Sequence, residues 1–447
     1  MEAIGIDVGS TNVKAVRVDA AGRLVAQAQH PLRWSGVGDV AETDAAALWS
    51  AVREAVAEVA ATATPTDDAV GSIGLCGQYS SIVPVDARLE PLAPMRLYLD
   101  QRGTAPCREL LAEHPDAFLA WLERHPIPPV GGGLALGHLL SFQADEPDVH
   151  RHTRAYLEPV DFVTAQLTGE VTATQGSMFA SQLVDNRTLT ATGYDPQFLE
   201  LSGVDPDRLP PLVPVGTVVG TVRGEVSAAL GIGADVPVVT GLTDSCAQAL
   251  ATGAHRPGRV GVAIGTTGVV LSAADQMGMD LDHEVLTMPG VDSDRYLVSA
   301  ENGIAGRAVE HILGSVLRSA GPRDGWGRDP FAGFDEALEA SEPGAGGVVF
   351  LPWLSGSMSP QADATARGGF VGLSLHTEGH DLVRAMAEGV AHNLRWLLAP
   401  VEAFTGHETT EAILTGGAAR SSAWAQVVAD VLECPVRTVA DPGHSGA

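Results

Sequence analysis

The sequence predicts an α/β protein built from two similar lobes, each a mixed β-sheet flanked by helices, and two observations carry this prediction. First, a strand, a short turn rich in Gly, Ser and Thr, and a returning strand occur twice, at residues 4–18 and 258–272. Second, strand-like and helix-like apolar patterns alternate in both halves, which favours sheets covered by helices. The length of 447 residues alone would suggest roughly three domains of about 150 residues, but the duplicated hairpin favours two large ones.

The first hairpin has the pattern of a phosphate-binding turn. Apolar residues alternate with small or polar ones over residues 4–8, which predicts a buried strand that ends near Asp7. The turn 9–12 offers backbone N–H groups and hydroxyls that can surround an anion, and Asp7 is then left to face Mg²⁺ through water. The expected residues of this half-site are Asp7, Gly9, Ser10, Thr11 and Lys14.

Lys14 is the only lysine of the chain, since every other member of the 27 Lys plus Arg residues is arginine. It falls on the returning strand of the hairpin, whereas a Walker loop places Gly-Lys-Ser/Thr at the start of a helix. The pattern therefore indicates a different kind of phosphate site. An ordinary β-hairpin with a solvated lysine is the alternative interpretation of this segment taken alone.

A second hairpin and a late Gly-Gly turn strengthen the phosphate interpretation. Strand 258–264 leads into the turn Gly265-Thr-Thr-Gly268, and strand 412–415 leads into Gly416-Gly417 and a helix with Ser421 as its N-cap. A Gly-Gly turn can lie flat against an adenine ring. The candidate nucleotide-binding residues here are Gly265, Thr266, Thr267, Gly306, Gly416, Gly417, Ala418 and Ser421.

These segments resemble the FGGY family of carbohydrate kinases, within the actin-like ATPase superfamily, and among them most closely the xylulokinases. The matching stretches run from Ile4 to Val439 and include Gly77-Gln78, Leu99–Arg102, Val236–Asp244 and Thr415–Ser421. The resemblance implies two actin-like (ribonuclease H-like) lobes with an interdomain cleft, and it implies ATP and Mg²⁺. We expect an N-terminal lobe at residues 1–243 and a C-terminal lobe at residues 244–447.

Asp244 is the candidate catalytic base, because it follows the apolar strand 236–239 at the expected crossing between lobes and precedes a helix. The family's base occupies the matching position. The alternative is that Asp244 only N-caps that helix, although both roles can coexist. Asp7 and Asp244 are the candidate metal ligands, and Asp244 is also expected at the sugar.

By resemblance, the sugar is contacted by Gln78, Asp100 and Arg102, with Tyr79 next to Gln78. Xylulokinases usually carry Met-His after the Gly-Gln pair, where this chain has Tyr79-Ser80. Tyr79 therefore has an alternative interpretation as a core aromatic. The expected reaction is ATP-dependent phosphorylation of a small sugar. The first candidate is the conversion of D-xylulose to D-xylulose 5-phosphate. The alternatives are ribulose, gluconate or glycerol as substrate, or a non-catalytic actin-like protein that binds nucleotide or sugar.

The end of the chain also departs from the family, whose members continue through an Ala-Gly-rich helix after the segment that here ends at Ala447. This suggests a truncated second lobe. A polar, Gly-rich run at residues 319–347 is expected to form a surface excursion.

Composition excludes several classes of function. The formal charge of −28 argues against binding to nucleic acid or to anionic membranes. We expect no signal peptide or membrane span, and four scattered cysteines without a Cys-x-x-Cys pair suggest a cytoplasmic protein. The expected partner is a small sugar or polyol, and a homodimer is allowed.

Overall fold

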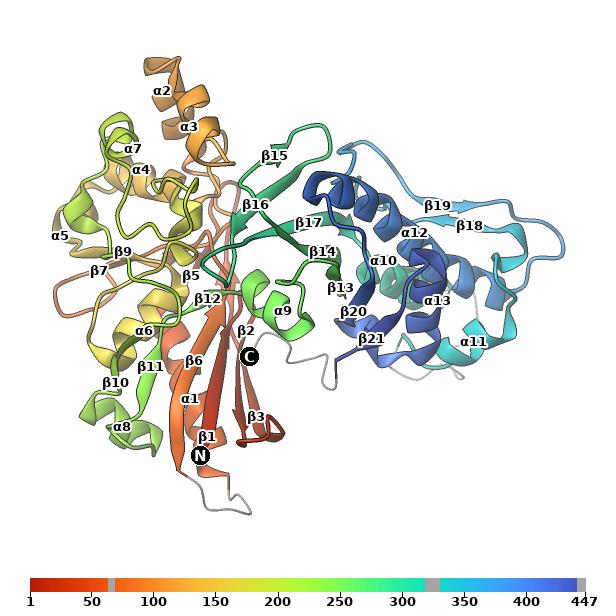
Figure 1. Ribbon diagram of the computed structural model, residues 1–447, viewed down its shortest axis with the longest axis horizontal. Helices are drawn as coiled ribbons and strands as arrows, with labels where there is room; N and C mark the ends of the chain where they lie inside the picture. The colour runs from red at the N-terminus through yellow and green to blue at the C-terminus, as the bar shows by residue number, and fades with distance from the viewer. Residues whose placement is uncertain (63–68, 318–329, 440–447) are drawn as a thin grey trace. The chain divides into compact units, whose positions relative to one another are not determined.

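The computed structural model describes residues 1–62, 69–317 and 330–439, which form two compact units (Figure 1). Unit 1 comprises Met1–Ala247 and the short segment Met288–Asp294, and unit 2 comprises Gln248–Thr287 and the described residues from Arg295 onward. The change between them falls inside helix α9 (Asp244–Thr252). The chain end at 440–447 and most of the first half of the 319–347 run lie outside the described residues.

Unit 1 is organised around a seven-stranded mixed sheet. Across it run β10 (Val218–Thr221), β11 (Pro237–Val239), β6 (Val70–Gly77), β1 (Glu2–Val8), β2 (Asn12–Val18) and β3 (Leu24–Pro31), with β12 (Leu242–Thr243) also paired to β6. Strands β1, β2 and β3 are antiparallel, whereas β1 and β6 are parallel. Side chains of β1 alternate between buried and half-buried, as the sequence pattern predicts.

Helices α1 (Ala45–Ala61), α6 (Pro159–Thr168) and α8 (Gly224–Leu230) pack on this sheet. Helix α1 begins after Asp44, whose side chain accepts a hydrogen bond from the Ala46 amide, and it buries an apolar face that includes Leu48, Val52 and Val56. It contacts β2 and β3 as well as α6 and α8, so the helices form one layer.

A second apolar core in unit 1 supports the region that carries the predicted sugar residues. It is formed by α2 (Thr104–Glu113), α3 (Ala117–Arg124), α4 (Ala135–Asp145) and α7 (Pro196–Ser202), near α5 (Pro147–His152). Trp121 stacks on Phe198 with ring centroids 4.4 Å apart, and its indole nitrogen donates to the Gln182 carbonyl. Short strands complete the unit: β4 (Trp34–Ser35), β5 (Glu42–Thr43), β7 (Val83–Val85), β8 (Met95–Arg96) and β9 (Ala155–Leu157).

Unit 2 repeats the plan of unit 1. Its seven-stranded sheet has the order β15 (Met279–Asp280), β16 (Val285–Pro289), β17 (Tyr296–Ile304), β14 (Thr267–Ala274), β13 (Arg259–Ile264), β20 (Glu411–Thr415) and β21 (Val436–Thr438). The β13–β14 hairpin is antiparallel and β13 runs parallel to β20, just as β1 pairs with β2 and β6. This shared topology confirms the predicted α/β fold with two sheet-containing units.

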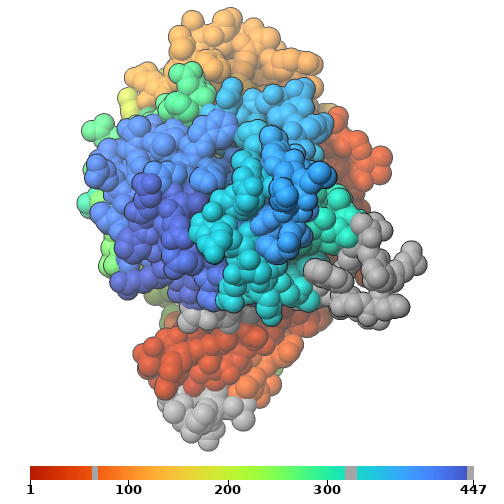
Figure 2. All heavy atoms as spheres, turned by 90° about the vertical axis from the view of Figure 1, so that its right-hand side faces the viewer, coloured from red at the N-terminus to blue at the C-terminus, as the bar shows by residue number. Residues whose placement is uncertain are grey.

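The helices of unit 2 gather on its sheet around the long helix α12 (Gly379–Thr405), which contacts β14 and β17. Beside it lie α10 (Gly306–His311), α11 (Phe334–Ala340) and α13 (Ser422–Leu432), and a small hairpin joins β18 (Val349–Leu351) to β19 (Gly369–Val371). Figure 2 shows the cyan α11 region beside the dark blue α13 region, where the rings of Phe334 and Trp424 meet with centroids 5.1 Å apart. Among the described residues, no helix combines the length and apolar character that crossing a bilayer requires.

Candidate active site

The β1–β2 hairpin brings two opposite charges together beside a tight turn. Asp7 and Lys14 are partners in the strand register, and Lys14 Nζ lies 3.8 Å from Asp7 Oδ2. The turn closes through a 3.0 Å hydrogen bond from the Gly9 amide to the Asn12 carbonyl, and a Cβ at Gly9 would lie 2.8 Å from that oxygen. Ser10 and Thr11 occupy the accessible tip. The predicted phosphate-side residues of unit 1 are therefore adjacent.

Strand register also brings Asp244 to this end of the sheet. Cys76 of β6 is paired with Asp7 on one side and with Leu242 of β12 on the other, and β12 leads directly into Asp244. Burial and, after it, the carboxylates of Asp7 and Asp244 raise the pKa of the Cys76 thiol well above its usual value, whereas Lys14 lowers it. Asp7, Lys14 and Asp244 thus share one electrostatic environment within unit 1.

Helix α9 starts at Asp244, so the capping position belongs to Thr243. The Thr243 hydroxyl accepts a hydrogen bond from the Cys246 amide at 3.3 Å. Asp244 Oδ1 accepts from the amide of Ser245 at 2.7 Å. Asp244 is half-buried and lies in the first turn of α9. Asp244 therefore does not occupy the N-cap position of α9.

The segment after β6 carries Gln78 in a tightly held loop. A Cβ at Gly77 would lie 2.6 Å from the Val8 carbonyl, which accepts the Gln78 amide at 2.9 Å, so the loop lies against the end of β1. The Gln78 side chain is 6% exposed, and within the described part of the chain its Nε2 has no hydrogen-bond partner. A buried amide donor without an acceptor is costly, and a substrate hydroxyl is one group that would satisfy it.

Two buried residues that sequence reasoning missed hold this loop. Glu158 accepts the amides of Ser80 and Ser81 at 3.2 and 3.1 Å, while His138 Nε2 donates to the Ser80 carbonyl at 3.1 Å. Ser80 has φ of +61°, a left-handed conformation that these bonds maintain. Glu158 directly follows the apolar strand β9 and begins a stretch, Glu158–Phe162, that resembles the family, and both were available signals. Tyr79 packs against the second core, which favours its interpretation as a core aromatic.

Asp100 and Arg102 form a network of charges rather than two independent contacts. Asp100 is fully buried, and its Oδ2 accepts the Ala41 amide at 2.9 Å and Arg102 Nη2 at 2.7 Å. Burial opposes ionisation, but the hydrogen bonds from Arg102 and Ala41 prevail and lower the pKa of Asp100. Arg102 is also paired with Glu42, and with Glu146 at 3.8 Å. The structure places Asp100 behind Arg102, whose side chain remains 23% exposed.

In unit 2, three turns meet at very short range. The Gly265 amide donates to the Thr267 carbonyl at 3.0 Å, which closes the β13–β14 turn. A Cβ at Gly306, the first residue of α10, would lie 2.3 Å from the Gly265 carbonyl. Gly416 has φ of +79°, and its Cβ would lie 2.5 Å from the Ile264 carbonyl. Only glycine allows these backbones to approach so closely.

A cavity of about 560 Å³ opens beside these turns, within the size range of small-molecule sites. Of the predicted nucleotide residues, it is lined by Gly265, Thr266, Gly306, Gly417, Ala418 and Ser421. Thr267 and Gly416 shape the neighbouring turns without lining it. Sequence reasoning missed the aromatic wall of Phe331, Phe334 and Trp424, and the charged groups Arg307, Glu310 and Arg420.

Ser421 connects the cavity wall to helix α13. Its hydroxyl accepts the Trp424 amide at 2.9 Å, as expected of an N-cap, and donates to Asp335 Oδ1 at 2.6 Å. These bonds fix α13 against α11, and with them Phe334 and Trp424. The cavity therefore combines a flat backbone turn with aromatic rings, which suits a nucleoside.

The donors around Asp7 and Asp244 fit a magnesium ion that keeps much of its water. Across residues 1–62, 69–317 and 330–439, no group of three or more His, Cys, Asp or Glu side chains could hold a metal by itself. Mg²⁺ bound with a nucleotide uses one or two carboxylates, phosphate oxygens and water, so one or two acidic residues suffice.

The duplicated sheet and its two glycine-rich hairpins define a class of protein, that of the actin-like ATPase fold. Models described as the N-terminal and C-terminal domains of the FGGY family of carbohydrate kinases match residues 2–251 and 260–447. The chain belongs to the FGGY family and is a carbohydrate kinase.

Individual relatives carry two different substrate names. The xylulose kinase of Streptomyces coelicolor is 31% identical over 97% of this chain and 83% of its own length. The gluconokinase of Bacillus subtilis is 25% identical over 97% of this chain and 83% of its own length. The crystal structure of xylulose kinase from Rhodospirillum rubrum superposes with a TM-score of 0.83 at 28% identity, covering 100% of this chain and 88% of that one.

Proposed function

We propose that this kinase transfers the γ-phosphoryl group of Mg–ATP to a hydroxyl of a small neutral sugar, with D-xylulose, converted to D-xylulose 5-phosphate, as the first candidate. The observation that carries the proposal is the strand register around Cys76, which brings Asp7, Lys14 and Asp244 to one end of the unit 1 sheet. An ammonium beside two carboxylates is a set suited to phosphoryl transfer, where charge neutralisation and positioning dominate.

On the nucleotide side, we assign the adenosine to the cavity of about 560 Å³ in unit 2. The glycine turns at Gly265 and Gly416 allow close approach, and the aromatic wall offers a face for stacking. We assign Lys14 to the neutralisation of negative charge on the phosphate groups of ATP. Bound magnesium supplies neutralisation of the phosphate oxygens, and Asp7 and Asp244 are the residues that would hold it.

Asp244 is assigned as the general base. The substrate hydroxyl oxygen forms the new bond to phosphorus, the bond from phosphorus to the departing ADP oxygen breaks, and the hydroxyl proton passes to the Asp244 carboxylate. In a loose transition state the proton leaves late, so the base contributes less than correct positioning.

Local charge favours a neutral sugar over an aldonate. The exposed cation near the sugar loop, Arg102, already faces Asp100, Glu42 and Glu146, which leaves little positive charge for a substrate carboxylate. The unpartnered donor in the loop is the neutral amide of Gln78. We propose that Gln78 and Arg102 contact the sugar and that Asp100 orients Arg102.

The test is ADP release from the purified protein with Mg–ATP and D-xylulose, D-ribulose, xylitol, glycerol or D-gluconate. We expect the highest kcat/KM with D-xylulose. A higher value with D-gluconate would contradict the charge argument, and no ADP release with any acceptor would favour a non-catalytic regulator.

We also propose a cytoplasmic location, which the four free cysteines support.

A further inference from the structure

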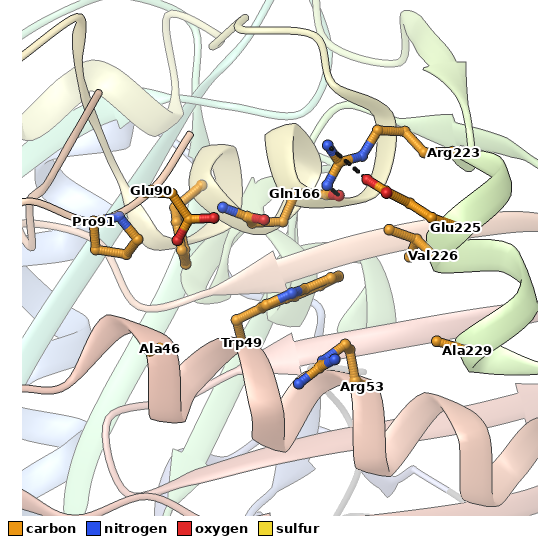
Figure 3. Close-up of a pocket in the computed structure, with 11 residues that line it drawn as sticks. Ala46, Trp49, Arg53, Glu90, Pro91, Gln166, Arg223, Glu225, Val226 and Ala229 are labelled. Atoms are coloured by element: carbon orange, nitrogen blue, oxygen red, sulfur yellow. Dashed lines mark hydrogen bonds and ion pairs between the residues drawn. The ribbon is translucent and has the colours of Figure 1, made fainter. Parts of the chain in front are cut away.

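A second cavity lies in unit 1 and contains none of the residues assigned above to the active site. It has a volume of about 330 Å³ and lies where α1, α6 and α8 approach the turn that follows β7 (Figure 3). Trp49 and Arg53 of α1 form one wall, and Gln166 of α6 lies opposite, with Glu90 and Arg223 on either side of it in the view. The cavity is a distinct recess with its own set of polar groups.

Several of these groups are held in place by their neighbours. The Gln166 side chain is 8% exposed, and its Nε2 donates to the Leu89 carbonyl at 2.6 Å. Arg223 Nη2 donates to the backbone carbonyl of Gln166 at 2.8 Å, and its Nη1 lies 3.4 Å from Glu225 Oε1. The Arg223 stem passes over Gly169, where a Cβ would lie 3.3 Å from Cδ. The arginine is therefore fixed before any ligand binds.

Glu90 is presented by a rigid turn. Asp86 Oδ1 accepts the amides of Arg88 and Glu90 at 2.7 and 2.9 Å, and between them Leu89 adopts a φ of +66° with its side chain buried in the core. A left-handed leucine is unfavourable by itself, so the surrounding contacts determine this conformation. The backbone that carries Glu90 is therefore held in place, while its side chain is exposed at the cavity.

One cationic group on the cavity wall is open to a ligand. The Arg53 side chain is exposed, its guanidinium lies 5.8 Å from the centroid of the Trp49 ring, and it forms no ion pair with another described residue. Arg223 Nε, in contrast, is buried away from solvent. Together with the exposed Glu90 carboxylate, Arg53 offers donors and an acceptor beside one aromatic face.

We propose that this cavity is a second binding site for a neutral sugar or polyol, separate from the active site. Two guanidinium groups, two carboxylates and one amide balance in charge, so neither an anion nor a cation is favoured. A hydroxyl both donates and accepts, and it can therefore satisfy arginine and glutamate together. The Trp49 ring supplies an apolar face for the ring or chain carbons of the ligand.

The test measures binding of D-xylulose, xylitol and D-glucose by isothermal titration calorimetry in the full-length protein. The variants are Arg53→Gln and Glu90→Gln, which change exposed side chains, with Arg88→Gln as the matched control on the same turn outside the cavity. We expect at least one of these sugars to bind with an affinity that falls about tenfold in each cavity variant and stays unchanged in the control. D-Gluconate is expected to show no binding that depends on Arg53.

A second pair of measurements separates this site from the active site. Gln78→Ala should remove binding at the sugar loop while it leaves the Arg53-dependent binding intact. Binding that is lost with Gln78→Ala and unaffected by Arg53→Gln and Glu90→Gln would overturn the second site, as would no binding of any of the three sugars. If the kinase substrate assigned above is wrong, ADP release with D-xylulose fails while the Arg53-dependent binding remains.

Discussion

Lys14 and Asp7 are directly opposed in the β1–β2 hairpin, with Lys14 Nζ 3.8 Å from Asp7 Oδ2. Their side chains are 27% and 16% exposed, so both reach solvent at the sheet end where Asp244 also lies. In a chain with a formal charge of −28, this ammonium is a local positive charge that can attract a phosphate group.

Replacing Lys14 should therefore affect the use of Mg–ATP. We expect Lys14→Ala to lower kcat/KM for ATP by about tenfold or more, the value of one charge-assisted hydrogen bond, and Lys14→Arg to keep most of the activity. Steady-state kinetics with varied ATP measures both. Arg23→Ala, at the next turn and 80% exposed, is the control. Equal activity in all variants would leave Lys14 as a solvated hairpin lysine.

Glu158 provides a test of the sugar loop, because its carboxyl group, whose pKa burial raises well above the usual range, accepts the amides of both Ser80 and Ser81. Glu158→Gln retains one acceptor oxygen and replaces the other by a donor, so one amide loses its partner. We expect KM for the sugar to rise several-fold while KM for ATP stays constant.

The control for this variant is Glu170→Gln, an exposed residue just after α6. Melting temperatures are recorded for both proteins because Glu158 is fully buried. A parallel rise in both KM values would indicate general loosening of unit 1 rather than a local change in the loop.

Asp161 on α6 should give the protein a characteristic dependence of stability on pH. Burial raises its pKa to about 8, against an ordinary value of 3.8, although a hydrogen bond with Ser177 acts in the other direction. The folded state thus keeps a proton that the unfolded chain releases. Stability from this group is complete below pH 3.8 and is lost as the pH rises toward about 8.

In Asp161→Asn this loss should disappear. The difference in free energy of unfolding between variant and parent is expected to grow between about pH 4 and pH 8, at no more than roughly 1.4 kcal/mol per pH unit, and then to level off. Urea unfolding at a series of pH values measures it. A difference that does not change with pH would show that Asp161 ionises normally in the folded protein.

Local patterns made much of the fold predictable. Both hairpins and the Ser421 cap of α13 follow from alternation and capping chemistry within short segments. The glycine turns were also recognisable from the Gly-rich pattern that follows each strand, and in the structure Gly9 and Gly416 occupy positions that exclude a Cβ.

Contacts between distant segments were not predictable in the same way. Glu158 and His138 reach the Ser80 loop from α6 and α4, and the cavity wall in unit 2 needs Phe334 and Trp424 to meet. Asp100 was predicted to contact the sugar, which stays a prediction, and its burial behind Arg102 became apparent only from the packing. Periodicity predicts which face of a helix or strand is buried. It does not predict which residues of other elements contact that face.

Asp244 is the residue that we propose as the general base. Asp244→Asn keeps the size and polarity of the side chain and an oxygen that can still face magnesium beside Asp7, so ATP and sugar binding should be nearly unchanged. Turnover should fall by about 10² to 10⁴, the usual contribution of a general base, with the lower end favoured by a loose transition state. Because Thr243 accepts the Cys246 amide, the variant should also melt close to the parent temperature.

Thr243→Ala provides the complementary measurement. It removes the hydroxyl that caps α9 and should cost about 1 kcal/mol of stability, while the carboxylate of Asp244 is retained. Turnover and melting temperature measured on both variants separate the roles, since a base lowers turnover and a cap lowers stability. Unchanged turnover with reduced stability in Asp244→Asn would return this aspartate to a structural role and would leave proton transfer to another group. In that case water or the transferred phosphate would accept the hydroxyl proton late in the reaction. Positioning of the substrates would then account for the catalysis.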